Sequence, residues 1–258
     1  MSVIAISTNK GGVLKTSLTV NLAGVLARQG KRVLIVDTDN QGNCALSFGL
    51  NPDQLKTTIY DVLISGTPFL PDAIRIVHDN IDLIGANDDM CFFEFDVLGN
   101  PRAFKQPFQL MRARLGPVRK KYDFVLIDTP PTLGLTQANV LTFADRVIVP
   151  FQPERYSMRS LIKIVDGIRD FREKHNSALD ILAVVPTLID SRTVLHSEVL
   201  QECRRFCQVQ NILVTDTVIP RTVRFAASVA YDQKPLTISD PKSAAAKIYE
   251  QLLKELIG

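Results

Sequence analysis

The feature that most constrains this sequence is a glycine-containing loop near its N-terminus. A short apolar run, residues 3–6, reads as a buried strand, and residues 18–29 have the apolar spacing of a helix closed by Gly30. Between them lies the loop 7–17, with the sequence S-T-N-K-G-G-V-L-K-T-S. Strand, glycine-containing turn, Lys-Thr and helix is the context of a phosphate-binding loop, because backbone N–H groups and the helix N-terminus both attract anions. We therefore expect a nucleotide phosphate site here.

Two side chains of the loop have the chemistry that such a site needs. Lys15 is placed to neutralise phosphate charge, and the hydroxyl of Thr16 is placed to bind Mg²⁺. The spacing departs from the ordinary G-x-x-x-x-G-K-[ST] pattern, because Asn9 and Leu14 stand where that pattern has glycines. A positive φ is costly for a residue with a Cβ, so Leu14 is the residue of the loop whose conformation is hardest to reconcile with a phosphate site. The alternative is a plain Gly-Gly turn with incidental lysines.

The remaining pattern predicts a single α/β domain over residues 1–258, with a mostly parallel twisted sheet and helices on both faces. Apolar runs alternate with helix-period segments, and residues 31–37 and 122–128 are continuous apolar strands, as expected when both faces are covered. Segment 92–99 is ambiguous. Further strands are expected at 81–84, 146–150, 181–185 and 212–214, and helices at 55–64, 102–121 (broken near Pro107 or Pro117), 155–175, 194–206 and 241–257.

Carboxylates follow two of the strong strands. Asp37 and Asp39 come at the end of the second strand, and Asp128 ends the third. The carboxyl ends of parallel strands hold the ligands of open α/β sheets. A strand-ending Asp is the Walker B arrangement, which holds Mg²⁺ through water. The alternative for all three is a solvated strand-to-turn position.

Net charge, cysteine content and hydropathy exclude few functions. The net charge of +3 is too small to declare a nucleic-acid partner, and the basic stretch 102–121 reads as a solvated helix face or, alternatively, as a nucleic-acid surface. The cysteines form no C-x-x-C pair, so we expect reduced thiols in a cytoplasmic protein; they are Cys44, Cys91, Cys203 and Cys207. No secretory signal is evident, and no apolar run approaches the roughly 20 residues of a membrane span.

Several segments together resemble one family. The pattern K-G-G-x-x-K-[ST] over residues 10–16 is similar to the deviant Walker A box of the ParA/MinD ATPases. Further segments occur in that family's order and rough spacing; they are residues 36–43, 126–131, 145–155, 188–193, 218–224, 234–236 and 240–243. Over nearly its whole length the chain resembles a ParA/Soj-type partition ATPase.

The resemblance implies the following roles. Lys10 reaches across an ATP-dependent homodimer to the partner subunit's ATP, Lys15 binds phosphates within its own subunit, and Asp39 orients or deprotonates the attacking water. Thr16 binds Mg²⁺, assisted by Asp128, and Asp37 lies near the metal. The nucleotide is held by residues Lys10, Gly11, Gly12, Val13, Leu14, Lys15, Thr16 and Ser17, with Pro220 and Arg221 against the adenine.

The resemblance also implies partners. The ATP-bound dimer binds non-specific DNA of the nucleoid, with Arg192 and Arg224 where relatives carry DNA-contacting arginines, and a ParB-like centromere-binding adaptor stimulates hydrolysis. Residues 180–258 hold nine Lys/Arg and nine Asp/Glu, so a DNA surface there requires spatial segregation of charge. A simple surface ion pair is the alternative for each arginine. Because the loop begins within ten residues of Met1, no N-terminal helix-turn-helix is expected.

Other functions remain open. A ParA-like positioner of a protein cargo, such as a carboxysome or a chemotaxis cluster, has the same enzyme core and a different partner. A MinD-like membrane switch needs a C-terminal amphipathic helix, and segment 244–257 reads instead as a packed core helix, so no membrane partner is expected. An iron–sulfur reductase needs paired cysteines near the end of the sheet, and Cys44 and Cys91 do not fit.

Overall fold

The computed structural model describes residues 2–66, 70–190 and 192–258. Its strands are β1 (Ser2–Ile6), β2 (Val33–Asp37), β3 (Ile74–His78), β4 (Ile81–Ile84), β5 (Phe124–Asp128), β6 (Arg146–Phe151), β7 (Asp180–Ile189) and β8 (Ile219–Pro220). Its α-helices are α1 (Lys15–Arg28), α2 (Asn43–Leu46), α3 (Ile59–Ile64), α4 (Phe93–Gly99), α5 (Leu110–Arg119), α6 (Leu135–Phe143), α7 (Ser157–Lys174), α8 (Val194–Val209), α9 (Arg224–Ala227), α10 (Leu236–Ser239) and α11 (Ala244–Ile257). Short 3₁₀ turns cover Pro52–Gln54, Pro71–Ala73, Asp88–Phe92 and Pro107–Gln109, and a π-helical turn covers Ser228–Asp232.

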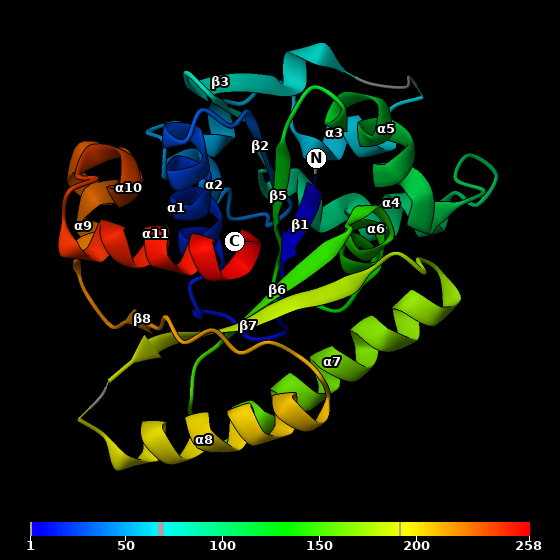
Figure 1. Cartoon of the computed structure of the whole chain (residues 1–258). Coiled ribbons are helices and arrows are strands. Elements are labelled where there is room, and N and C mark those ends of the chain that lie inside the picture. The colour runs from blue at the N-terminus through cyan, green and yellow to red at the C-terminus, as the bar shows by residue number, and fades with distance from the viewer. Residues whose placement is uncertain (1, 67–69, 191) are drawn as a thin grey trace.

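The strands of the described residues form one eight-stranded sheet, in the order β3-β4-β2-β5-β1-β6-β7-β8 (Figure 1). Every neighbouring pair is parallel except β3–β4, which is an antiparallel hairpin. The register places Ile6 of β1 beside Asp128 of β5, and Asp128 beside Asp37 of β2. The ends of three central strands therefore lie next to one another, at the edge of the sheet where the loop after β1 begins.

Alternation along the central strands divides the core into two layers. On β1, Val3 and Ala5 pack into one cluster with α3, α4, α5, α6, α7 and α8, whereas Ile4 and Ile6 pack into a second cluster with α1, α2, α10 and α11. Figure 1 shows α1 and α11 on one side of the sheet and α3 to α8 on the other. The expected parallel sheet with helices on both faces is confirmed.

Helix α1 is clamped on its outer face. The Asn21 carbonyl accepts a hydrogen bond from Thr237 Oγ1 at 3.0 Å, and the Asn21 side chain accepts one from the Thr237 N–H at 3.2 Å. Beside them Gly24 lies so close to Thr237 that any Cβ there would collide with it. The first helix and the small helix α10 are thus fixed against each other.

The largest departures from the sequence-based elements lie at the periphery. The expected strand at 212–214 is reduced to a single bridge between Val214 and Val184. The closing helix starts after Ser243, whose hydroxyl caps it, so Pro241 does not lie in its first turn. The expected helix at 55–64 forms only from Ile59, and the ambiguous segment 92–99 is mostly helical. The sequence did not predict the hairpin strand β3 or the helices α6, α9 and α10, because their apolar residues do not repeat with a clear strand or helix period.

Candidate active site

The loop after β1 enters α1 through left-handed backbone. Gly12 has a φ of 70°, and Leu14, immediately before the helix, has a φ of 68°. For a residue with a Cβ this conformation costs about 1–2 kcal/mol. The half-buried Leu14 side chain packs against the apolar cluster around α1, which offsets part of that cost. Leu14 therefore adopts the left-handed backbone that favours glycine, at a position where the ordinary pattern has glycine.

Lys15 is held against its own loop. Its Nζ donates a hydrogen bond to the Lys10 carbonyl at 3.1 Å, and the residue is buried. Burial lowers the pKa of Lys15, while the carboxylates of Asp128 and Asp39 act in the opposite direction. A buried cation between loop carbonyl and carboxylates is positioned to receive a further anion.

Lys10 makes an ion pair within the same chain. Its Nζ lies 2.6 Å from Glu154 Oε2 and 3.5 Å from Ser157 Oγ. The hydrogen bond from Lys10 is the main reason that the pKa of Glu154 is lowered, with further contributions from Arg221 and His196. The Lys10 side chain therefore contacts the segment that joins β6 to α7.

Thr16 and Asp128 are in direct contact. Thr16 Oγ1 donates to Asp128 Oδ2 at 2.5 Å, across the step from the start of α1 to the end of β5. Asp128 is buried, and its Oδ1 has no hydrogen-bond partner among the described residues. Burial raises the pKa of Asp128 to about 6, against the opposing effects of Thr16 and Lys15.

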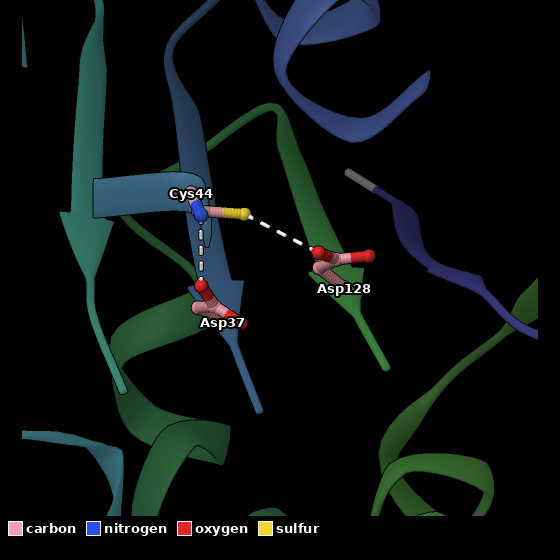
Figure 2. A group of neighbouring side chains, drawn as sticks. All are labelled: Asp37, Cys44 and Asp128. Atoms are coloured by element: carbon pink, nitrogen blue, oxygen red, sulfur yellow. Dashed lines mark hydrogen bonds between the residues drawn. The ribbon is translucent and has the colours of Figure 1, made fainter. Parts of the chain in front are cut away.

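Asp37 is the second buried carboxylate. Its Oδ2 accepts from the Cys44 N–H at 2.9 Å and its Oδ1 from the Asp39 N–H at 3.0 Å. Burial and then the neighbouring Asp128 raise its pKa to about 8. Figure 2 shows that the Cys44 side chain, from the start of α2, extends toward Asp128, to whose Oδ2 the thiol donates at 3.6 Å.

These groups fit a hard divalent cation. Mg²⁺ binds through one or two carboxylates, hydroxyls and water, and keeps several waters of its own. The hydroxyl of Thr16 and the unpartnered Oδ1 of Asp128 supply that donor set, and Asp37 adds a second carboxylate beside it. Burial raises the pKa of both carboxyls, Asp128 further raises the pKa of Asp37, and a bound cation would favour the ionised form of each.

Asp39 differs from both in its surroundings. It is half-buried, and its Oδ1 accepts from the Gln41 N–H at 3.1 Å, within the turn after β2. It acts electrostatically on Lys15 and Asp128, so its carboxylate faces the same space. The Asp39 carboxylate is therefore partly accessible to water beside the two buried carboxylates.

The other predicted loop residues serve in different ways. A Cβ built on Gly11 meets nothing within 4 Å, so the backbone there is open on that side. The apolar side chain of Val13 is buried. The Ser17 hydroxyl lies 3.1 Å from the Tyr249 hydroxyl of α11. The Ser17 side chain therefore connects α1 to the closing helix, and only its backbone is left for a phosphate.

Pro220 and Arg221 stand at the same edge of the sheet. Pro220 ends β8, and the Arg221 N–H donates to the carbonyl of Ile189, the last residue of β7, at 3.2 Å. The exposed Arg221 acts on Glu154 electrostatically, which places it on the side of the loop where Lys10 is held.

The two arginines predicted to contact DNA are in different states. Arg192 forms a bidentate pair with Asp190, with Nε–Oδ1 at 2.9 Å and Nη2–Oδ2 at 2.8 Å, which lowers the pKa of Asp190. Arg224 begins α9 and is exposed, and its guanidinium has no ion pair within the described ranges. Only Arg224 presents an uncompensated charge.

Two residues of this site carried no assignment from the sequence. Glu154 lies three residues beyond the end of β6, and Cys44 lies seven residues beyond Asp37, in α2. Both follow the carboxyl end of a strand, which is the one signal that pointed to them. Their partners are distant in sequence, so their contacts needed the fold.

Known proteins share this sequence and fold. Residues 1–181 match a family described as "AAA domain". Soj, the sporulation initiation inhibitor protein of Bacillus subtilis, is 35% identical, with 98% of this chain and 97% of Soj aligned. The chromosome partitioning protein ParA of Caulobacter vibrioides is also 35% identical, over 100% of this chain and 94% of that protein.

A solved structure agrees with the sequence relatives. It is named cobyrinic acid a,c-diamide synthase from Mycobacterium smegmatis and contains an ATP analogue and magnesium. It superimposes with a TM-score of 0.84 at 30% identity, and the match covers 98% of this chain and 93% of that one. The sequence matches to Soj and to ParA span nearly the whole chain, and on this basis the chain belongs to the ParA family of P-loop ATPases.

Proposed function

We propose that this protein is a Mg²⁺-dependent ATPase that partitions DNA, acting as an ATP-dependent homodimer on non-specific DNA. The observation that carries the proposal is the convergence of Lys15, Thr16, Asp128 and Asp39 at one edge of the sheet. Partition proteins among the relatives and the nucleotide and magnesium in the solved neighbour support it.

In the proposed reaction each residue has a separate task. Lys15 holds phosphate charge in its own subunit, and Thr16 and Asp128 orient Mg²⁺, which neutralises charge on the transferred phosphoryl group. Asp37 lies near the metal as a second carboxylate. Asp39 accepts a proton from, or orients, the attacking water. Pro220 and Arg221 pack against adenine in this proposal.

Lys10 gives the dimer its dependence on ATP. A second cation that reaches the partner subunit's phosphates stabilises the same developing charge as an arginine finger does. For this role Lys10 has to leave Glu154, which it contacts at 2.6 Å. Lys15 Nζ donates to the Lys10 carbonyl, so a nucleotide that binds Lys15 would also affect the position of Lys10.

DNA binding is proposed to depend on the exposed Arg224, with Arg192 contributing once it leaves Asp190. Contacts to phosphates are independent of sequence and weaken steeply with salt. A ParB-like centromere-binding protein is the proposed stimulator of hydrolysis, and the cytoplasmic nucleoid the proposed site of action.

The deciding experiment measures binding to random-sequence DNA with ATP, with ADP and without nucleotide, at two fixed salt concentrations. Tight, salt-dependent binding in the presence of ATP, and not with ADP or without nucleotide, supports the proposal. Lys15→Ala should abolish this DNA binding. Equal binding in all three states, or none, would refute DNA partition while leaving ATP hydrolysis to be measured separately.

Two alternatives have specific tests. A positioner of a protein cargo shares all of these properties, so the cargo must be found by localisation in cells. A membrane switch is disfavoured because Tyr249, Leu252 and Leu256 of α11 are buried. Within the described ranges, no helix combines the length and hydropathy needed to cross a bilayer. Strong co-sedimentation with anionic vesicles in ATP would favour the membrane switch instead.

A further inference from the structure

Three side chains that can bind a metal come together beneath the phosphate loop. Asp37 ends β2, Asp128 ends β5, and Cys44 is the second residue of α2. One ligand atom from each lies within 4.8 Å of the other two, and all three residues are buried (Figure 2). The sulfur is what distinguishes this group from the oxygen-only donors of a Mg²⁺ site.

The spacing suits a tetrahedral ion. Cys44 Sγ lies 3.6 Å from Asp128 Oδ2. Zinc bound by sulfur at about 2.3 Å and oxygen at about 2.1 Å in tetrahedral geometry sets those two atoms about 3.6 Å apart. The two donor atoms therefore already have the separation of neighbouring zinc ligands. In the metal-free protein the thiol proton lies between them, and the ion would replace it.

The two oxygens of Asp128 differ in their surroundings. Asp128 is 1% exposed, its Oδ2 contacts the Cys44 thiol, and its Oδ1 has no hydrogen-bond partner among the described residues. Figure 2 shows the second oxygen pointing away from Cys44. Buried polar atoms are nearly always paired, so Oδ1 indicates a missing partner on that far side, where the cation of the nucleotide would lie. A cation in the cluster would bind Oδ2 of the same carboxylate.

The surrounding contacts orient the donors. The N–H groups of Cys44 and Asp39 donate to the two oxygens of Asp37, and Thr16 Oγ1 donates to Asp128 Oδ2, the oxygen that the Cys44 thiol also contacts. Such outer contacts fix ligand orientation in metal sites. Thr16 is half-buried, so the cluster lies one side chain below the surface.

We propose that Asp37, Cys44 and Asp128 form a binding site for a thiophilic divalent cation of the Zn²⁺ class in the nucleotide-free protein. Binding releases the Cys44 proton to solvent and forms the metal–thiolate bond; no electron is transferred. Thiolate ligands select zinc, whereas Mg²⁺ takes oxygen alone. Because Asp128 belongs to both sites, the thiophilic ion competes with the Mg²⁺ that the proposed ATPase requires.

Cobalt(II) is the probe, because a thiolate ligand gives it a charge-transfer absorption in the near ultraviolet. Titration of reduced, nucleotide-free protein should produce this band with one equivalent of Co²⁺, and Zn²⁺ should remove it. Cys44→Ser keeps the side-chain size, and should abolish the band and weaken Zn²⁺ binding by more than about 100-fold, the loss that even outer-shell changes can reach. Asp37→Asn should weaken binding in the same direction.

The other thiols provide matched controls. Cys91 is exposed, and Cys203 and Cys207 are buried together on α8. Cys91→Ala, and Cys203→Ala with Cys207→Ala, should leave the band unchanged. A band that survives Cys44→Ser, disappears in either control, or never forms in wild-type protein would overturn the proposal. Circular dichroism verifies that each variant is folded.

The competition is tested by nucleotide binding and not by turnover. Zn²⁺ should lower the affinity of wild-type protein for a fluorescent ATP analogue in Mg²⁺, and should have no such effect on Cys44→Ser. This arm rests on the proposed role of Asp128 in Mg²⁺ binding, whereas the cobalt band does not. If the band forms and Zn²⁺ leaves nucleotide affinity unchanged, the metal site stands and the shared role of Asp128 is wrong.

Discussion

The ammonium group of Lys10 lies 2.6 Å from the carboxylate of Glu154 in the same chain. The side chains keep 30% and 48% of their exposure, so water screens the pair and it contributes no more than about 1 kcal/mol. A contact of that size orients Lys10 and can be broken by a competing anion. In the proposed dimer the competing anion is the partner subunit's nucleotide.

Glu154→Gln should therefore promote dimerisation. Removal of the carboxylate charge frees Lys10, so the dimer should form at about fivefold lower protein concentration with a non-hydrolysable ATP analogue, in line with about 1 kcal/mol. Sedimentation velocity measures the shift. Asp170→Asn removes an exposed ion pair with Lys174 on α7 and should change nothing. Weaker dimerisation in Glu154→Gln would mean that Glu154 belongs to the dimer contact itself.

Asp39→Ala should separate binding from hydrolysis. The Asp39 carboxylate has one hydrogen bond, within its own turn, so the loop should keep its shape without it. We expect ATP binding to persist and phosphate release to fall by about 100-fold or more, the usual contribution of a general base. The variant should accumulate as a DNA-bound dimer in gel filtration with ATP. Loss of ATP binding would show that Asp39 serves the nucleotide and not the water.

Substitution of Leu14 tests the left-handed backbone at a φ of 68°. Leu14→Gly relieves about 1–2 kcal/mol of backbone strain and loses packing and unfolded-state entropy of similar size, so stability should change by less than about 1 kcal/mol. Leu14→Ile keeps the volume and adds a β-branch, which positive φ excludes. It should lower both the free energy of unfolding and ATP affinity. Urea unfolding and calorimetric titration give the two readouts, and equal behaviour of both variants would contradict the strain argument.

The buried carboxyls predict a falling stability with rising pH in the nucleotide-free, metal-free protein. Asp37 and Asp128 have pKa values raised from 3.8 to about 8 and about 6, with Cys44, Asp39 and Lys15 as their charged or titratable neighbours. Between the ordinary and raised values the folded chain holds protons that the unfolded chain has lost. Their stabilisation is therefore complete below about pH 4 and is lost as pH rises through about 6 and then about 8.

Asp37→Asn should remove most of that pH dependence. Its amide imitates the protonated acid, so the variant should gain stability over wild type as pH rises from about 5 to about 8, measured by urea unfolding with a chelator present. A constant difference across this range would show that Asp37 is ionised throughout. Addition of Mg²⁺ should reduce the difference, because the cation favours the ionised carboxylates.

The two predicted DNA-binding arginines should differ in effect. Arg224 has no ion pair among the described residues, whereas Arg192 is bound to Asp190 by two hydrogen bonds. Arg224→Glu should lower DNA affinity by about tenfold or more at fixed low salt and reduce the salt slope. Arg192→Ala should cost less, and Asp190→Ala should raise affinity. Filter binding with ATP measures all three, with Arg172→Glu on α7 as the charge-matched control. Equal losses from both arginines would contradict the difference in pairing.

Much of the site was predictable because its signals are local. Lys15, Thr16 and Asp128 are each identified by a strand end or a helix start, and parallel pairing brings strand ends together without further information. The contacts of Lys10 and Ser17 were not predictable in this way. Their partners, Glu154 and Tyr249, lie 144 and 232 residues away in the chain, and only the folded sheet brings them near.

The same distinction applies to the fold. Strands such as β2 and β5 are continuous apolar runs, which the period of the sequence identifies directly. The segment at 212–214 is apolar too, yet β7 offers it only one bridge, at Val184. The short helices α9 and α10 have four residues each, too few to repeat a helical period, and they form because α1 and α11 supply the surface on which they pack.

Hydrogen bonds join α1 to two other helices: Ser17 contacts Tyr249 of α11, and Asn21 contacts Thr237 of α10. These contacts hold the helix that begins at Lys15 against the last helices of the chain. The side chain of Lys10, which precedes α1, is held by its partly exposed pair with Glu154. In the proposed ATPase, Lys10 would therefore change partner while α1 stays in place, and a protein that senses the bound nucleotide would contact the carboxyl edge of the sheet.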